Sequence, residues 1–190
     1  MSKIITPYIT AQALHSQGLN SRGIKQKADS SEIIKIKRGL YRNAKFEELG
    51  NQSFADLAMA VPYGVVCLLS ALSYHELTTF LPSFVYLAIP NNARAPKIHY
   101  PPLKYYYFSP EQYSAGIETI KIGNYPVKIY CQEKTICDCF RYRNKVGLDM
   151  AKEGLKEYMK LKNRDINKML HYAGICRVKP LIETWLNAIV

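Results

Sequence analysis

The chain has 190 residues, of which 48% are hydrophobic and 12% aromatic. This composition excludes general disorder and predicts a substantial core, in one medium domain or in a small domain plus a larger one. The formal net charge of +11 at pH 7 indicates an anionic partner, or an excess of surface lysine that serves solubility. The net charge is +5 over residues 1–50, −1 over residues 51–120 and +7 over residues 121–190, which favours two functional surfaces over an evenly charged globule.

Cysteine usage and hydropathy predict where the protein works. The five cysteines are odd in number and irregularly spaced, which predicts free thiols in a reducing cytosol. No signal-peptide pattern opens the chain, and no apolar run approaches the roughly 18–20 residues that span a bilayer. We therefore expect a cytoplasmic protein without a membrane partner.

Two short helices are predicted near the N-terminus. Residues 11–18 form the first, with Thr10 as its cap and Gly18 at its end. The second begins with Ser21 as its cap, buries Ile24 and Ala28, and carries Arg22, Lys25, Gln26 and Asp29 on another side. Two helices joined by a glycine-containing turn are typical of a helix-turn-helix, although the longer helix that usually precedes such a pair is missing.

A basic two-stranded ribbon is predicted directly after these helices. The alternation over residues 34–37 places isoleucines on one face of a strand and lysines on the other. Arg38 and Gly39 form the turn, and residues 40–42 return. A helix with Arg and Gln beside a ribbon with Lys and Arg is typical of a winged helix-turn-helix that binds DNA, although basic side chains can also merely solvate a surface.

The two elements have different predicted roles on DNA. Arg22, Lys25 and Gln26 are expected at base edges of the major groove, because Arg pairs with guanine and Gln with adenine through two hydrogen bonds. The ribbon is expected to contact phosphates, which contribute affinity and salt dependence but no sequence information. The full predicted DNA-contacting set is Ser21, Arg22, Lys25, Gln26, Lys27, Lys35, Lys37, Arg38 and Arg42.

The polar connector over residues 43–52 is the predicted domain boundary, which gives a winged helix-turn-helix domain at residues 1–45 and a second domain at residues 53–190. The fold class is α+β, with a helical C-terminal part. The second domain is expected to begin with a helix stopped by Pro62, followed by a buried helix in the apolar run VVCLLSALSYHEL. Strands are predicted at residues 84–89 and 104–108, followed by a hairpin over residues 120–130 that turns at Gly123–Asn124.

Four helices are predicted from Glu133 to the end of the chain. They cover residues 133–143, an amphipathic stretch after Gly147, a helix capped by Asn163, and a last helix through Trp185. The basic residues on this part have two interpretations, a solvated face or a docking surface for an acidic partner or flanking DNA. The residues of that surface are Arg141, Arg143, Lys145, Lys152 and Lys156.

No catalytic or metal-binding pattern is visible. Cys137 and Cys139 lie about 200° apart on a helix, and no further pair completes a tetrahedral zinc set, so we expect buried thiols. Ser70 and His75 share a helix but do not face each other, and no serine elbow or phosphate-binding glycine loop occurs. The sequence therefore predicts a non-enzymatic protein without a cofactor or metal.

Four segments, in order, resemble the AbiE-type antitoxins of type IV toxin–antitoxin systems. They are IIKIKRGLYR, GVVCLLSALSYHELT, VYLAIP and KTICDCFRYRNKVGLDMAKEGLKEYM, and the similarity extends over nearly the whole chain from Thr10. These antitoxins are abortive-infection proteins of phage defence, also described as predicted transcriptional regulators of viral defence.

The resemblance implies a bacterial protein with two activities. Its winged helix-turn-helix represses its own operon by binding inverted repeats in the promoter, with the DNA contacts on residues 21–27 and 35–42. Its second domain, residues 54–190, counters a nucleotidyltransferase-like toxin without a stable complex. Two alternatives stay open: a stand-alone winged-helix regulator with a ligand-sensing or dimerising second domain, and an enzyme that acts on nucleic acid through its basic C-terminal surface.

Overall fold

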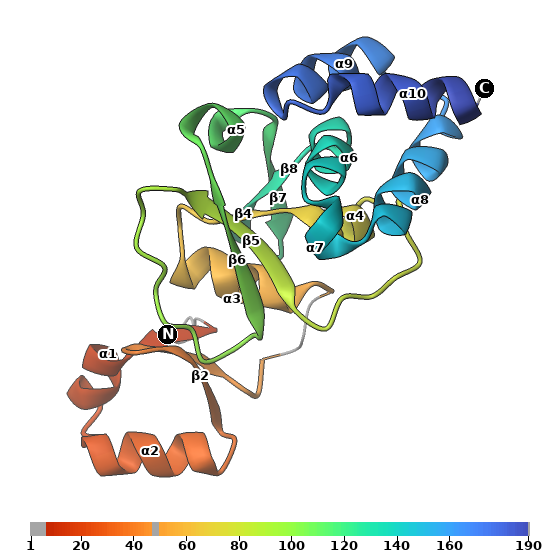
Figure 1. Cartoon of the computed structure of the whole chain (residues 1–190). Coiled ribbons are helices and arrows are strands. Elements are labelled where there is room, and N and C mark those ends of the chain that lie inside the picture. Colours follow the sequence, from red (N-terminus) through yellow and green to blue (C-terminus); the bar gives the residue numbers. More distant parts are fainter. Residues whose placement is uncertain (1–6, 47–49, 190) are drawn as a thin grey trace.

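The computed structural model describes residues 7–46 and 50–189 and has a mixed α+β fold with two separate β-sheets (Figure 1). This confirms the α+β part of the predicted fold class. The smaller sheet has the strand order β1-β3-β2 and the larger one the order β6-β5-β4-β8-β7. In Figure 1, the small sheet and the first two helices lie at one end of the molecule, and the C-terminal helices lie at the other.

The N-terminal elements build the small antiparallel sheet and the two helices that cover it. In chain order they are β1 (Tyr8–Thr10), α1 (Ala11–Ser16), α2 (Ser21–Asp29), β2 (Ile33–Lys37) and β3 (Leu40–Asn43). Thr10 caps α1 as predicted, since its hydroxyl accepts a hydrogen bond from the backbone N–H of Ala13 at 3.2 Å. The cap of α2 is Asn20 and not Ser21, because the Asn20 side chain accepts from the Gly23 N–H at 2.8 Å. Both are good capping residues, and the prediction was wrong by one position.

The predicted basic ribbon is present, but its alternation is interrupted. β2 and β3 pair antiparallel with a bulge between Lys35 and Lys37. Ile36 is fully buried against the larger part of the protein, and Ile33, three positions earlier and so on the opposite face of the strand, packs into the small cluster between the sheet and the two helices. After the bulge, Lys37 pairs with Leu40 and lies on the side of the strand that faces α3, so the bulge changes the direction of this one side chain.

The larger sheet is mixed and is covered by helices. Its elements are α3 (Gln52–Ala60), β4 (Val65–Val66), α4 (Leu68–Tyr74), β5 (Val85–Pro90), β6 (Leu103–Phe108), α5 (Pro110–Ser114), β7 (Ile117–Ile122) and β8 (Tyr125–Tyr130). β5 pairs parallel with β6 and antiparallel with β4, and β4 pairs parallel with β8. The hairpin β7–β8 turns at Gly123–Asn124, and the two strands before it lie where they were predicted. The apolar run after Pro62 is not one helix, because its first two valines form the strand β4 between β5 and β8.

The chain ends in five helices: α6 (Gln132–Arg141), α7 (Arg143–Val146), α8 (Leu148–Met159), α9 (Ile166–Ile175) and α10 (Lys179–Ile189). The predicted first helix of this part, residues 133–143, matches α6 to within two residues at each end, and α7 is a further short helix that was not predicted. The cap of α9 is Asp165 and not Asn163, since the Asp165 carboxylate accepts from the Lys168 N–H at 2.8 Å. No helix in the described ranges is both long and apolar enough to cross a membrane.

Two large hydrophobic clusters fill the spaces on either side of the larger sheet. One lies between the sheet and the helices α4, α6, α8, α9 and α10. The other lies around α3 and includes Tyr8, Ile36 and Leu40 of the small sheet. The small sheet is therefore packed onto the rest of the protein through a common apolar core, and α3 lies between the two sheets in Figure 1.

An ion pair lies inside the first of these clusters. Lys134 and Asp138 of α6 are one helical turn apart and fully buried, with Nζ 2.6 Å from Oδ2. The ammonium group also lies over the rings of Tyr130 and Phe108, at 4.4 and 4.9 Å from their centroids. Lys134 packs against Gly116, which has φ +73°; a Cβ there would lie 2.8 Å from Lys134 Cβ. Local patterns do not indicate this pair, because Lys and Asp are usually exposed.

All five cysteines are buried and free, as predicted. Cys137 and Cys139 point into the core from α6, on either side of Asp138. Burial raises the pKa of the Cys139 thiol well above its ordinary value, and it raises the pKa of Cys131 to about 11. These thiols therefore act as small apolar side chains and carry no thiolate at neutral pH.

Candidate functional site

Helix α2 lies at the end of the molecule away from the larger sheet (Figure 1). Arg22, Lys25 and Gln26 are all exposed on it. Ile24 lies on the opposite side, 4% exposed, where it packs against Leu14 of α1 and Ile33 of β2. The apolar side therefore holds the helix on the small sheet and leaves the three predicted base-contacting residues free to meet a partner.

The turn of the ribbon adds one further exposed cation. Arg38 is exposed at the β2–β3 turn, and Gly39 beside it adopts φ +80°, a conformation that glycine reaches without steric cost. Lys35 is half-buried on β2. Lys27 of α2 is paired with Glu32, its Nζ 2.6 Å from the carboxylate, so part of its charge is neutralised within the protein.

Two of the predicted phosphate contacts need correction. Arg42 is 1% exposed, and its Nε lies 3.2 Å from Oδ1 of the buried Asp56 in α3. Lys37 turns inward, and its Nζ donates to the carbonyl of Ala60 at 2.7 Å. Arg42 therefore lies out of reach of DNA, and the amino group of Lys37 is already bonded within the protein.

The burial of Arg42 has a signal in the sequence. Side chains two apart on a strand lie on the same face, so Arg42 lies on the face of the buried Leu40. The sequence does not show which residue pairs with Arg42. The partner, Asp56, lies fourteen positions further along the chain, near the polar start of a helix, where a carboxylate is expected to be exposed. The pair depends on a tertiary contact that local patterns do not reveal.

Arg42 and Asp56 belong to a polar cluster at the junction of the small sheet and α3. The Tyr8 hydroxyl donates to Asp56 Oδ1 at 2.6 Å. The Gln52 amide donates to both, at 3.0 Å to the Tyr8 oxygen and 3.2 Å to Asp56. Burial raises the pKa of Tyr8 well above its ordinary value, and the hydrogen bond to Asp56 raises it further. We call Tyr8, Arg42, Gln52 and Asp56 the junction cluster, and it fixes the orientation of the small sheet on α3.

The predicted C-terminal basic residues are spread over three helices, α6, α7 and α8, and three of them make close contacts within the protein. Arg141 donates to the carbonyl of Cys176 and Arg143 to that of Phe140, both at 3.0 Å. Lys152 lies over the ring of Trp185 at 4.4 Å. Lys145 and Lys156 are exposed.

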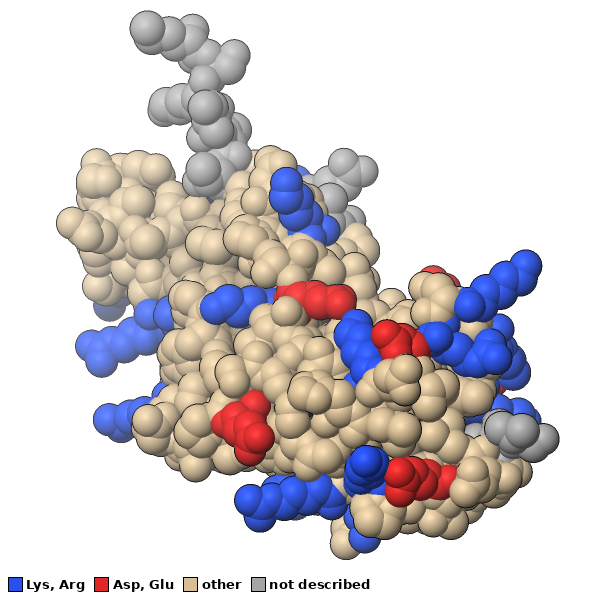
Figure 2. All heavy atoms as spheres, turned by 90° about the horizontal axis from the view of Figure 1, so that it is seen from above, with Lys and Arg blue, Asp and Glu red and all other residues tan. Residues whose placement is uncertain are grey.

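Figure 2 shows one face of the C-terminal end, on which Lys and Arg side chains are scattered among Asp, Glu and uncharged residues. On this face they do not merge into a continuous patch. This scatter is typical of a solvated face. On α2, by contrast, Arg22, Lys25 and Gln26 are neighbours on one exposed side.

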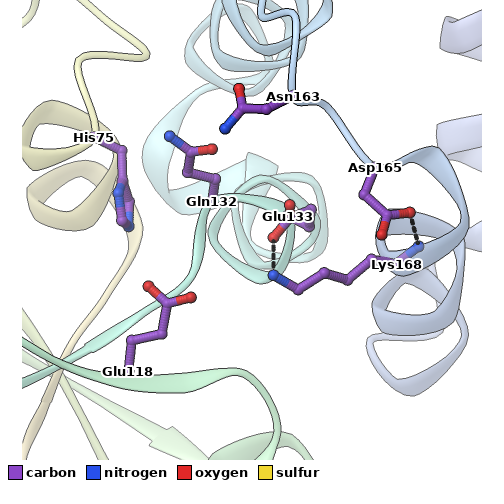
Figure 3. A pocket seen from close by; sticks show the side chains of 7 residues that line it. All are labelled: His75, Glu118, Gln132, Glu133, Asn163, Asp165 and Lys168. Atoms are coloured by element: carbon purple, nitrogen blue, oxygen red, sulfur yellow. Dashed lines mark hydrogen bonds and ion pairs between the residues drawn. The ribbon is translucent and has the colours of Figure 1, made fainter.

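A polar pocket of about 380 Å³ opens at the start of α6 and α9 (Figure 3). It is lined by His75, Glu118, Gln132, Glu133, Asn163, Asp165 and Lys168. In Figure 3, His75 and Glu118 lie on one side, and Asp165 and Lys168 lie on the other. The lining comes from α4, β7, α6, the α8–α9 connection and α9, so no local motif in the sequence indicates this pocket.

Glu133 is the buried carboxylate of this pocket. Its Oε1 accepts from the Tyr158 hydroxyl at 2.8 Å, and its Oε2 lies 3.0 Å from Lys168 Nζ. Burial acts to raise the pKa of Glu133, but hydrogen bonds from its own backbone, Lys168 and Tyr158 outweigh burial and hold the pKa below its ordinary value. Glu133 is therefore ionised at neutral pH.

The candidate catalytic side chains do not form a site. The Ser70 hydroxyl donates to the Phe84 carbonyl at 3.4 Å and accepts from the Tyr86 N–H at 3.0 Å, so it links α4 to β5. The His75 ring contacts the Tyr130 carbonyl at 2.7 Å. In the part of the chain that the structure describes, no three His, Cys, Asp or Glu side chains are grouped so that they could hold a metal ion.

The sequence matches no protein-family model and none of the curated proteins.

Proposed function

We propose that this chain is a DNA-binding antitoxin of the AbiE type, which represses its own promoter and counters a nucleotidyltransferase-like toxin in the cytoplasm. The DNA-binding half rests on one observation above all. Helix α2 carries Arg22, Lys25 and Gln26 on its exposed side, next to the exposed Arg38 at the tip of the β2–β3 turn.

The element order supports a winged helix-turn-helix for this part. A strand, two helices and a two-stranded ribbon follow one another, and the first strand completes the sheet by pairing with the ribbon. In such domains the second of two adjacent helices enters the major groove, which is about 12 Å wide. α2 is that helix, and Arg38 in the wing position contacts the neighbouring backbone. β1 forms the edge of the small sheet next to β3. In this domain a strand therefore stands in front of α1, where a longer helix usually stands.

The antitoxin half rests on the resemblance and on where its segments lie. Three of the four similar segments cover β4 with α4, then β5, then α6 to α8, and these elements build the core around the larger sheet. The likeness therefore concerns the residues that specify the fold of residues 54–190. No individual side chain is assigned to toxin neutralisation.

DNA binding is tested on the promoter upstream of the gene by fluorescence anisotropy. The double variant Arg22→Glu/Lys25→Glu should bind that promoter at least a hundredfold more weakly, because two attractive contacts become repulsive. A matched control is Lys162→Glu/Arg164→Glu, which changes the charge equally on the exposed α8–α9 connection at the other end of the molecule. Equal binding by the wild type and the α2 variant would exclude α2 as the DNA-reading helix.

The antitoxin role is tested separately in cells. The adjacent gene is expressed from an inducible promoter, and this chain should restore growth when it is supplied from a second plasmid. The Arg22→Glu/Lys25→Glu variant should restore growth equally well, because its second domain is unchanged. Failure of the wild-type chain to restore growth would favour the second candidate, a winged-helix regulator with a ligand-sensing second domain, which the polar pocket supports.

A further inference from the structure

The polar pocket is built from side chains that are held in place. Tyr158 donates to Glu133 at 2.8 Å and accepts from the Asp165 N–H at 2.6 Å, so one hydroxyl ties α6 to the start of α9. Asp165 in turn caps α9 through the Lys168 N–H at 2.8 Å. Two of the three carboxylates of the pocket are thus fixed before any ligand arrives, which lowers the entropy cost of binding.

The positive charge in the lining is already neutralised. Lys168 is half-buried and lies 3.0 Å from Glu133, so these two charges cancel. The carboxylates of Glu118 and Asp165 remain, and the pocket keeps a formal charge of −2 when His75 is neutral. An anion in this space would face three carboxylates, whereas a cation would be attracted.

The remaining hydrogen-bonding groups offer several acceptors, namely the Glu118 carboxylate and the side-chain carbonyls of Gln132 and Asn163, whose NH2 groups can also donate. The side chains of Glu118, Gln132 and Asn163 have no hydrogen-bond partner among residues 7–46 and 50–189. The His75 Nε2 faces a carbonyl, which only accepts, so in the neutral ring Nε2 carries the proton and Nδ1 has the lone pair. A ligand with several N–H donors can therefore bond to the acceptors of this set.

We propose that this pocket binds a small organic cation that carries primary ammonium or guanidinium groups. Glu118 and Asp165 pair with its charge, and Gln132, Asn163 and His75 Nδ1 accept further hydrogen bonds from it. The volume of about 380 Å³ lies at the lower end of small-molecule sites, which suits a molecule of the size of a short polyamine. The polar lining excludes an apolar ligand, and the proposal is independent of DNA binding by α2.

The test is isothermal titration calorimetry of the full chain with spermidine, agmatine and arginine as probes, at low salt and neutral pH. At least one of them should bind, and Glu118→Gln and Asp165→Asn should each weaken its affinity at least tenfold. Both variants should fold, because Glu118 is exposed on β7 and asparagine caps a helix as well as aspartate does.

The matched control is Asp149→Asn, which removes the same charge from an exposed position on α8. It should leave the affinity unchanged. The proposal is overturned if none of the three probes binds at millimolar concentration, or if Asp149→Asn weakens binding as much as Asp165→Asn. Binding of glutamate in place of the cations would also overturn it.

Discussion

The Arg42 guanidinium and the Asp56 carboxylate form an ion pair in the interior of the protein, with Nε 3.2 Å from Oδ1 and both residues at most 1% exposed. The pair joins β3 of the small sheet to α3. Arg42, which the sequence predicted as a DNA contact, is therefore a structural link between two parts of the chain.

The first prediction concerns this link. Asp56→Ala should lower the free energy of unfolding by about 3–5 kcal/mol, because it leaves a buried guanidinium without its charge partner. Urea denaturation followed by circular dichroism measures the change. Asp29→Ala, at the exposed end of α2, is the control and should have little effect. A variant at position 56 as stable as the wild type would show that the pair contributes no net stability.

The second prediction separates two neighbouring cations of the ribbon. Arg38→Ala should reduce the slope of log affinity against log salt by about one, because one phosphate contact is lost. Lys37→Ala should leave that slope unchanged, since its amino group is bound to the Ala60 carbonyl. Promoter binding across a salt series measures both. A larger change for Lys37→Ala than for Arg38→Ala would reverse the assignment of the two side chains.

The third prediction concerns Gly116. An alanine there would have φ +73° and a Cβ 2.8 Å from Lys134 Cβ. Gly116→Ala should therefore lower the free energy of unfolding by about 2–4 kcal/mol, from backbone strain and overpacking together. Gly174→Ala in α9 meets no atom within 4 Å and should instead stabilise the protein by about 1 kcal/mol. Thermal unfolding of the two variants compares these opposite signs.

The fourth prediction is a pH dependence of stability that Glu133 contributes. The pKa of Glu133 in the folded protein is below its ordinary value of 4.5, so its contribution is fully present above that pH and is lost as pH falls through the folded pKa. Glu133→Gln should be less stable than the wild type by about 1–2 kcal/mol at neutral pH, because two charge-assisted hydrogen bonds weaken. The difference should shrink as the solution is acidified.

Urea unfolding at a series of pH values measures this convergence. Glu183→Gln, which removes an exposed carboxylate from α10, should follow the wild type throughout. A constant difference between the wild type and Glu133→Gln at every pH would mean that packing, and not charge, accounts for the loss.

Local patterns predicted the elements whose signals lie within a few residues. The β7–β8 hairpin follows from Gly123–Asn124 between alternating apolar residues, and the amphipathic stretch after Gly147 forms α8. The exposed side of α2 was likewise visible in the spacing of Arg22, Lys25 and Gln26.

The elements that the sequence did not reveal depend on distant partners. β1 and β4 have three and two residues, and they are strands only because β3, β5 and β8 lie beside them. The ion pairs of Arg42 and Lys134 require burial that polar residues rarely undergo. The polar pocket joins five segments from residue 75 to residue 168, so it exists only in the folded chain.

If the chain binds an operator of inverted half-sites as proposed, the junction cluster also constrains the spacing of those half-sites. The junction cluster and the common core hold α2 at a fixed angle to the rest of the protein. Two copies bound to inverted half-sites therefore cannot reorient their larger parts when the half-sites are rotated relative to each other around the duplex. B-DNA turns once in about 10 base pairs, so inserting about five between the half-sites places the second copy on the opposite side of the duplex. Any cooperativity that depends on contact between the two copies should then disappear and return when a full turn is inserted.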